Sequence, residues 1–289
     1  DPSSLFDVQI KRIHEYKRQL LNLLHVVARY QAMLAQPDGP DGRGWTPRTV
    51  ILAGKAASAY RVAKQIVQLA HDIARVINSD PRVSDRLKLV FLPNYGVSLA
   101  EVIIPAADLS EQISTAGTEA SGTGNMKFAM NGALTIGTWD GANIEMAQAI
   151  GVEDFFVFGQ RVEGINALRA IGYDPRLYAE QDLRLRHVLG AIGSGAFSPG
   201  EPGRYRDLVD SLLHRDRYFL LADFADYLAT QARVDALHAD KAAWAASALR
   251  NIAGMGGFSC DRSVRDYWEQ VWSPAALRLS RLDRRGSHA

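Results

Sequence analysis

Short apolar segments alternate with helix-forming segments along the first half of the chain, and this alternation limits the possible folds. The segments are continuously apolar, which is typical of strands that are buried on both faces. Such strands are expected at 49–52, 87–92, 109–113, 133–136 and 155–158, with helices at 58–78, 97–104, 126–131 and 142–150. Strands separated by helices predict an α/β fold, a Rossmann-like parallel sheet with helices on both faces. Ligands of such sheets bind beyond the carboxyl ends of the strands.

The two ends of the chain have helical patterns instead. Apolar residues spaced three and four apart predict one long amphipathic helix over 8–34, ended by a loop rich in Pro, Gly and Asp. After residue 174 the strand pattern stops, and helices are expected at 176–192, 204–214, 226–252 and 261–272. We therefore expect an α/β portion over residues 1–173 and a helical portion over residues 174–289.

Composition excludes several classes of protein. The chain has 33 basic and 32 acidic residues, and this balance gives no support for a nucleic-acid or membrane-surface protein. Its one cysteine, Cys260, excludes a disulfide framework and a Cys-rich zinc module. No apolar run is long enough to span a membrane and no signal-peptide pattern is present, so we expect a cytoplasmic protein. The histidines do not pair at metal-ligand spacing, and no metal site is expected.

A glycine-rich segment, Glu119–Phe128, is the first candidate site. Gly122 and Gly124 allow a sharp turn before a helix, whose free N–H groups can bind an anion. The segment lacks the spacing of a P-loop and of the dinucleotide fingerprint, because Lys127 stands where a third glycine is required. A phosphate cradle with a lysine suits a phosphorylated aldehyde cofactor. The pattern alone leaves open a glycine-rich turn with a solvated lysine.

A basic segment, Lys11–Arg18, is the second candidate. On the expected helix Arg12 and Lys17 border the apolar stripe on opposite sides, where they could bind a phosphate together. The alternative is a solvated basic helix start with an ion pair between Lys11 and Glu15. Tyr95 follows an expected strand and could stack on a flat cofactor ring, although an aromatic residue there can also be core.

Both segments closely resemble the glycogen, starch and maltodextrin phosphorylases. The resemblance includes Leu5–Leu24, the run from Glu111 to Phe128, Asn131–Thr138 and Asp140–Asn143, and it extends to about Trp272. Further details at 196–199 and 202–210 are most similar to bacterial glycogen phosphorylases. The resemblance covers most of the C-terminal lobe of a GT-B-type glycosyltransferase with two lobes. We therefore expect the N-terminal lobe to be missing from this chain.

The resemblance implies a reaction and a cofactor. Members of this family transfer the terminal glucosyl unit of an α-1,4-glucan to inorganic phosphate and release glucose 1-phosphate. Their cofactor is pyridoxal 5'-phosphate, whose phosphate group serves as a proton relay. By resemblance, Lys127 carries the Schiff base, Thr123 and Gly124 bind the cofactor phosphate with the help of Lys11, and Tyr95 packs against the cofactor.

The resemblance also assigns the substrates. Arg12 and Lys17 are expected to hold the substrate phosphate, while Glu119, Ser121 and Gly122 bind hydroxyl groups of the glucosyl unit. The parent protein is expected to be a homodimeric enzyme. The chain alone is expected to be inactive, because the opposite wall of the active site would belong to the missing lobe, which is a partner of this chain.

Two residues depart from the family pattern, and two other functions stay open. Gly96 stands where animal relatives have an arginine near the cofactor phosphate, and Trp139 stands where relatives have a smaller side chain. One alternative is another pyridoxal-phosphate enzyme, such as an aminotransferase. The other is a non-catalytic remnant that binds carbohydrate, cofactor or a partner.

Overall fold

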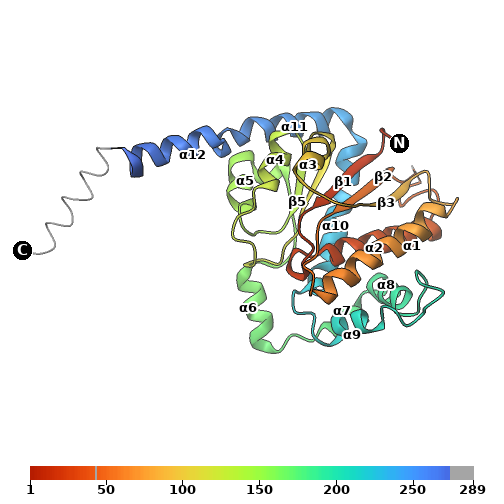
Figure 1. Cartoon of the computed structure of the whole chain (residues 1–289). Helices are drawn as coiled ribbons and strands as arrows, with labels where there is room; N and C mark the ends of the chain where they lie inside the picture. Colours follow the sequence, from red (N-terminus) through yellow and green to blue (C-terminus); the bar gives the residue numbers. More distant parts are fainter. Residues whose placement is uncertain (43, 274–289) are drawn as a thin grey trace, which may run out of the picture.

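A six-stranded sheet, all of whose neighbouring strands are parallel, forms the centre of the molecule (Figure 1). The computed structural model describes residues 1–42 and 44–273. Its strands are β1 (Leu5–Ile10), β2 (Arg48–Ala53), β3 (Leu87–Leu92), β4 (Leu109–Gln112), β5 (Leu134–Gly137) and β6 (Phe155–Val157). They lie in the order β3-β2-β1-β4-β5-β6, the order of the Rossmann fold. The predicted α/β class is confirmed.

The strand order places a topological switch point between β1 and β4. From β1 the chain moves outward to β2 and β3, then returns to β4 on the other side of β1 and moves outward again. The connections that follow β1 and β4 therefore leave the sheet in opposite directions. A crevice opens between them at the carboxyl edge, where ligands of such sheets bind.

Helices cover both faces of the sheet, as predicted. One face packs against α1 (Gln19–Ala35), α2 (Arg61–Ser79) and α10 (Leu220–Ala239). The other packs against α3 (Val97–Ala106), α4 (Gly124–Met130), α5 (Asn143–Ile150) and α11 (Lys241–Gly254). Alternate residues of β1 show this division, because Leu5 belongs to the first core whereas Val8 and Ile10 belong to the second.

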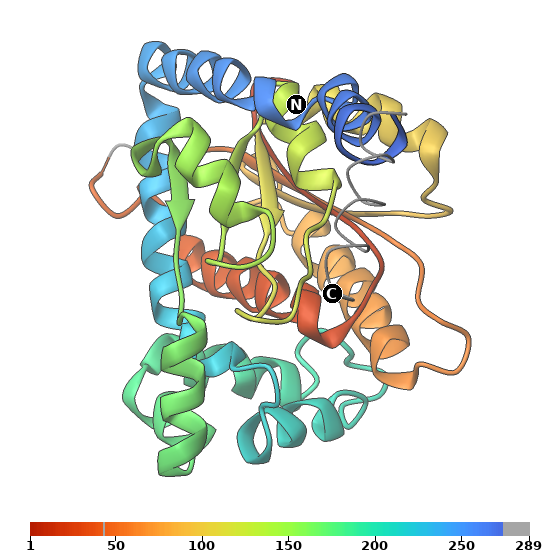
Figure 2. The same ribbon diagram turned by 90° about the vertical axis from the view of Figure 1, so that its left-hand side faces the viewer.

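The C-terminal part is helical, with different boundaries from those predicted. Its other helices are α6 (Val162–Ile171), α7 (Pro175–Gln181), α8 (Leu183–Gly193), α9 (Arg206–His214) and α12 (Cys260–Tyr267), followed by a π turn at Trp268–Trp272. Helices α7 to α9 form a layer beyond α1, and α12 extends away from the sheet (Figures 1 and 2). The sequence pattern missed α6. Residues 274–289 of the expected helical portion lie outside the described residues.

Two of the predicted helices are each divided in two by an aspartate. The helix expected at 176–192 breaks at Asp182, whose carboxylate accepts hydrogen bonds from the first backbone N–H groups of α8. The helix expected at 226–252 begins earlier, at Leu220, and breaks at Asp240, which caps α11 in the same way. Because an aspartate can satisfy these N–H groups, it starts a new helix where apolar periodicity alone suggests a continuous one.

The prediction of one helix over 8–34 is wrong at its start. Residues of this segment form the central strand β1 and a 3-10 turn at Glu15–Lys17, and α1 begins only at Gln19. Arg18 adopts the left-handed conformation (φ 57°), which ends the turn. Its buried guanidinium pairs with Asp223 of α10 at 2.6 Å. Pairing of β1 with β2 and β4 supplies long-range hydrogen bonds that local periodicity cannot indicate.

Candidate functional site

A cavity of about 810 Å³ opens at the switch point, at the carboxyl edge of the sheet. It is lined by the segments that follow β1, β2 and β3, by the chain between β4 and α4, and by the start of α5. All the residues predicted for the site contribute to its lining: Lys11, Arg12, Lys17, Tyr95, Glu119, Ser121, Gly122, Thr123, Gly124 and Lys127. The structure brings these residues to one pocket, and their individual roles stay predictions.

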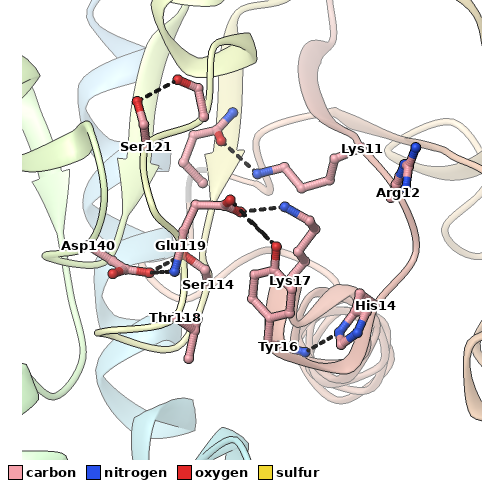
Figure 3. Close-up of polar contacts among 12 residues, drawn as sticks. Lys11, Arg12, His14, Tyr16, Lys17, Ser114, Thr118, Glu119, Ser121 and Asp140 are labelled. Atoms are coloured by element: carbon pink, nitrogen blue, oxygen red, sulfur yellow. Dashed lines mark hydrogen bonds and ion pairs between the residues drawn. The ribbon is translucent and has the colours of Figure 1, made fainter.

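Lys11 bridges the switch point. It is the first residue after β1, and its Nζ donates a hydrogen bond to Oε1 of Gln112, at the end of β4, at 2.6 Å (Figure 3). The end of β2 approaches it closely, since a Cβ on Gly54 would lie 1.9 Å from the Lys11 carbonyl oxygen. Burial, together with the neighbouring charge of Lys17, lowers the pKa of Lys11 to about 8. An anion in the pocket would therefore stabilise the charged form of Lys11.

Lys17 forms the second polar link across the pocket. Its ammonium pairs with the Glu119 carboxylate, and the Tyr16 hydroxyl donates to the same carboxylate at 3.4 Å (Figure 3). Burial acts to lower the pKa of Lys17, but the hydrogen bonds with Glu119 and Tyr16 outweigh it and raise the pKa. Lys17 is therefore a permanent cation at neutral pH, held by the 3-10 turn that follows β1.

The expected ion pair between Lys11 and Glu15 does not form. Lys11 turns towards Gln112, and the Glu15 carboxylate accepts a hydrogen bond from the Tyr60 hydroxyl at 2.5 Å. The two residues are not one turn apart on a helix, because Lys11 follows a strand. The solvated-helix interpretation of the basic segment is therefore wrong in its geometry.

Three further basic side chains line the pocket and have no hydrogen-bond or ion-pair partner in the part of the chain that the structure describes. Those of Arg12, Lys55 and Lys127 are exposed, and none forms a hydrogen bond or ion pair with a residue in the described ranges. Lys127 lies in the last turn of the short helix α4, and the preceding segment 121–124 is exposed as well. The glycine-rich segment thus presents main-chain and side-chain groups to an open, positively charged space, which is what binding of a phosphate group requires.

Tyr95 and the two unusual residues can now be placed. Tyr95 is half-buried beside α3, and burial raises the pKa of its hydroxyl, so that the ring faces the pocket in neutral form. A Cβ on Gly96 would have no atom within 4 Å, so this position offers open space at the pocket rim. Trp139 packs against the apolar cluster of α4 and α5, with the Arg161 guanidinium 4.9 Å from its ring centre. The Trp139 side chain therefore lies outside the pocket.

Several lining residues were not predicted from the sequence: Lys55, Gln112, Ser114, Asp140 and Asn143. Each follows a strand or ends one, so the general rule for the carboxyl edge of a parallel sheet was the signal that could have found them. Four of them, Gln112, Ser114, Asp140 and Asn143, lie in the segments of the family resemblance, which assigns them no role. Within the described part of the chain, no three His, Cys, Asp or Glu residues gather as a metal site would require. No helix there is long and apolar enough to cross a membrane.

Comparison with known proteins decides the family. The sequence profile of carbohydrate phosphorylases matches residues 1–274. The chain belongs to the carbohydrate phosphorylase family. Two bacterial relatives are named glycogen phosphorylase: that of Pasteurella multocida is 56% identical over 94% of this chain, and that of Haemophilus influenzae is 53% identical over 96%. The muscle form of human glycogen phosphorylase is 51% identical over 98% of the chain.

This phosphorylase chain is short for its family. The alignments cover 33%, 34% and 33% of those three relatives, so the chain spans about a third of their length. The basic and glycine-rich walls of the pocket belong to this chain, and the remaining two thirds of the relatives have no counterpart in it.

Proposed function

We propose that the complete protein containing this chain is an α-1,4-glucan phosphorylase. It would use inorganic phosphate to remove the terminal glucosyl unit of glycogen or a related glucan as glucose 1-phosphate. Family membership and the names of the relatives support this function. The observation that carries it is the convergence of Lys11, Arg12, Lys17 and Lys127 with an exposed glycine-rich segment on a single pocket.

The pocket fits pyridoxal 5'-phosphate. Lys127 is exposed and has no partner among the described residues, so its amine is available for attachment of an aldehyde. Thr123 and Gly124 expose their main chain to the same space, and Lys11 supplies a cation whose pKa an anion would raise. Tyr95 offers an uncharged ring at the rim. Bound there, the cofactor would supply a phosphate group that exchanges a proton with the substrate phosphate.

Arg12 and Lys17 would hold the substrate phosphate. Two phosphate groups in contact repel each other, so cations fixed around them lower the free energy of that arrangement. Arg12 is free to contribute a planar, bidentate group, and Lys17 is a permanent cation tied to Glu119. Glu119, with Ser121 and Gly122, would bind hydroxyl groups of the glucosyl unit. The ion pair between Lys17 and Glu119 thus joins the phosphate side of the pocket to the sugar side.

Excluding water and orienting the glucan would require the part of the protein that lies outside this chain. Arg12, Lys127 and the segment 121–124 are exposed here, so one lobe leaves the reacting groups open to solvent. Orientation of two reactants contributes about 7–11 kcal/mol to lowering a barrier. We infer that residues 1–173 bind the cofactor and the substrate phosphate, that the helical portion beginning at residue 174 packs on the same lobe, and that the 289-residue chain alone has no measurable turnover.

The test is release of glucose 1-phosphate from glycogen and inorganic phosphate by the complete protein with its cofactor. We expect phosphorolysis, and we expect no transamination of amino acids with 2-oxo acids by the same preparation. Transamination without phosphorolysis would overturn the proposal. Turnover by residues 1–289 alone would show that the second wall of the pocket is not required.

A further inference from the structure

The segment Asp140–Asn143, to which no role has been assigned, wraps around the glycine-rich loop. Asp140 is only 4% exposed, and its carboxylate accepts three hydrogen bonds, of which Figure 3 shows those from Ser114 and Glu119. Oδ2 accepts from the Ser114 hydroxyl at 2.7 Å and from the Glu119 backbone N–H at 2.9 Å, while Oδ1 accepts from the Gly117 backbone N–H at 2.8 Å. One buried carboxylate therefore holds residues 114, 117 and 119, which lead from β4 into the glycine-rich segment.

The next three residues extend the same contact along the loop. The Ala142 backbone N–H donates to the Ser121 carbonyl oxygen at 3.0 Å, and the Asn143 side chain accepts from Nδ2 of Asn125 at 3.1 Å. Gly141 precedes these two residues with φ +52°, and a Cβ there would lie 2.9 Å from the Ser121 carbonyl oxygen. Only glycine allows this close approach without strain. The glycine-rich loop is thus held at several points along its length by one short segment.

We propose that Asp140 is a positioning residue of the phosphorolysis site and acts through Glu119. The inference rests on the proposed function, in which Glu119 binds the glucosyl unit. The hydrogen bond from the Glu119 backbone to Asp140 places the Glu119 side chain opposite Lys17 and Tyr16, on the other side of the pocket. Without Asp140, the loop would lose three hydrogen bonds to an ionised acceptor, and these are stronger than neutral ones.

The chemistry of the contact makes the carboxylate specific. All three partners of Asp140 are hydrogen-bond donors, so both of its oxygens must accept. Asparagine has the same shape but one acceptor atom and one donor group. In either orientation its NH₂ group faces a backbone N–H, from Gly117 or from Glu119. An Asp140→Asn substitution therefore removes at least one of the three hydrogen bonds and sets two donors against each other, while it keeps the side-chain volume.

The experiment compares D140N with D154N in the complete, cofactor-loaded protein. Asp154 is an equally buried carboxylate, 4% exposed, that accepts hydrogen bonds from Ser247 and Arg250 and does not line the pocket. We expect kcat/KM for phosphorolysis to fall about 10²-fold in D140N, because small displacements of a binding group have effects of this size. In the folded D154N protein we expect kcat/KM to change less than about twofold.

A double-mutant cycle with E119Q separates positioning from general damage. If Asp140 acts through Glu119, the double variant is barely less active than E119Q alone, because the two residues act as a unit. The inference would be overturned if the two substitutions reduced kcat/KM independently, so that their effects multiplied in the double variant. It would also be overturned if kcat/KM of D140N stayed within about twofold of that of the unaltered protein. If D140N does not fold, the S114A variant is measured instead. We expect its kcat/KM to fall about fivefold or more, and an unchanged kcat/KM would contradict the inference. An unaltered protein without phosphorolysis would instead overturn the proposed function.

Discussion

Two of the charged clusters in the described part of the chain, one at the carboxyl edge of the sheet and one buried against its face, use similar residues in opposite ways. The pocket cluster lies at the carboxyl edge and includes the exposed Arg12 and Lys127. The buried cluster lies between the sheet and α10 and includes Asp7, Arg29, Arg48, Glu111, Tyr227, Gln231 and Asp235. In the first, several cations lack partners within the described chain. In the second, the charged groups bond to one another.

The buried cluster shows how charges are kept inside a core. Arg48 binds Asp7 at 2.8 Å and Asp235 at 2.7 Å, and it also binds Gln231. Burial raises the pKa of Glu111 well above its usual range, and the nearby Asp7 raises it further. The cluster shows that this chain pairs its buried charges with one another, whereas exposed cations grouped in a pocket indicate a site for an anionic ligand.

The largest expected effect separates the two clusters. Lys127→Ala in the complete protein should reduce phosphorolysis by about 10³-fold or more, because attachment of the cofactor is lost. The free energy of unfolding of the cofactor-free protein should change by less than about 0.5 kcal/mol, since Lys127 is exposed. Glucose 1-phosphate release and denaturant titration measure the two effects. Full activity of the variant at native cofactor content would remove Lys127 from the mechanism.

Removing a partner from the buried cluster should have the opposite outcome. Arg48→Met would leave Asp7 and Asp235 without their shared cation, which costs about 3–5 kcal/mol of stability for a buried pair. Activity should follow the folded fraction, because Arg48 does not line the pocket. Denaturant unfolding and kinetic measurements at a temperature where the variant is folded test this. A stable variant with reduced kcat would contradict the division into two clusters.

The phosphate side of the pocket predicts a selective change in KM. Arg12→Ala and Lys17→Ala should each raise the KM for inorganic phosphate about 10- to 100-fold, in line with about 1.5–3 kcal/mol for a charge-assisted hydrogen bond. The KM for glucan should change much less. Steady-state kinetics with each substrate varied in turn would decide the point. Equal effects on both substrates would assign these side chains a general structural role.

The smallest effect concerns the pH dependence of stability at Lys11. Its pKa is about 8 in the folded chain and 10.5 in the unfolded chain, so the unfolded state binds the proton more tightly. Protonated Lys11 therefore lowers the free energy of unfolding. This destabilising contribution is fully present below pH 8 and disappears as the pH rises towards 10.5. Lys11→Met should therefore be more stable at pH 7 by about 1–3 kcal/mol, with a difference that shrinks above pH 8. Denaturant titrations of the cofactor-free protein from pH 7 to 10 measure it, and a constant difference would contradict the assignment.

The sequence indicated most of the sheet but not its centre. The strand expected at 87–92 is β3 with the same bounds, because a continuously apolar run between turn residues has few other solutions. The second half of the central strand β1 falls within the helix predicted over 8–34, and its first half falls in no predicted element. Its hydrogen bonds come from strands about 40 and 100 residues away, and a periodicity window contains neither of them.

The candidate site shows the same limit. The glycine-rich segment and the basic segment could be found because each is local in sequence, and the structure places both at one pocket. The contacts that hold these segments together could not be predicted, because they join residues far apart in the sequence. Lys11 bonds to Gln112, and Asp140 bonds to the loop at Glu119. Arg12 and Lys17 reach the pocket from a loop and a 3-10 turn, not from the flanks of a helical stripe.

The most direct test of the account is to locate the cofactor on the chain. The complete protein, purified with its cofactor, would be reduced with borohydride, digested and analysed by mass spectrometry. We expect the pyridoxyl group on the peptide that contains Lys127, and on neither Lys11 nor Lys55. Attachment at one of those two lysines, or a protein active in phosphorolysis with no modified lysine, would contradict the assignment of this pocket.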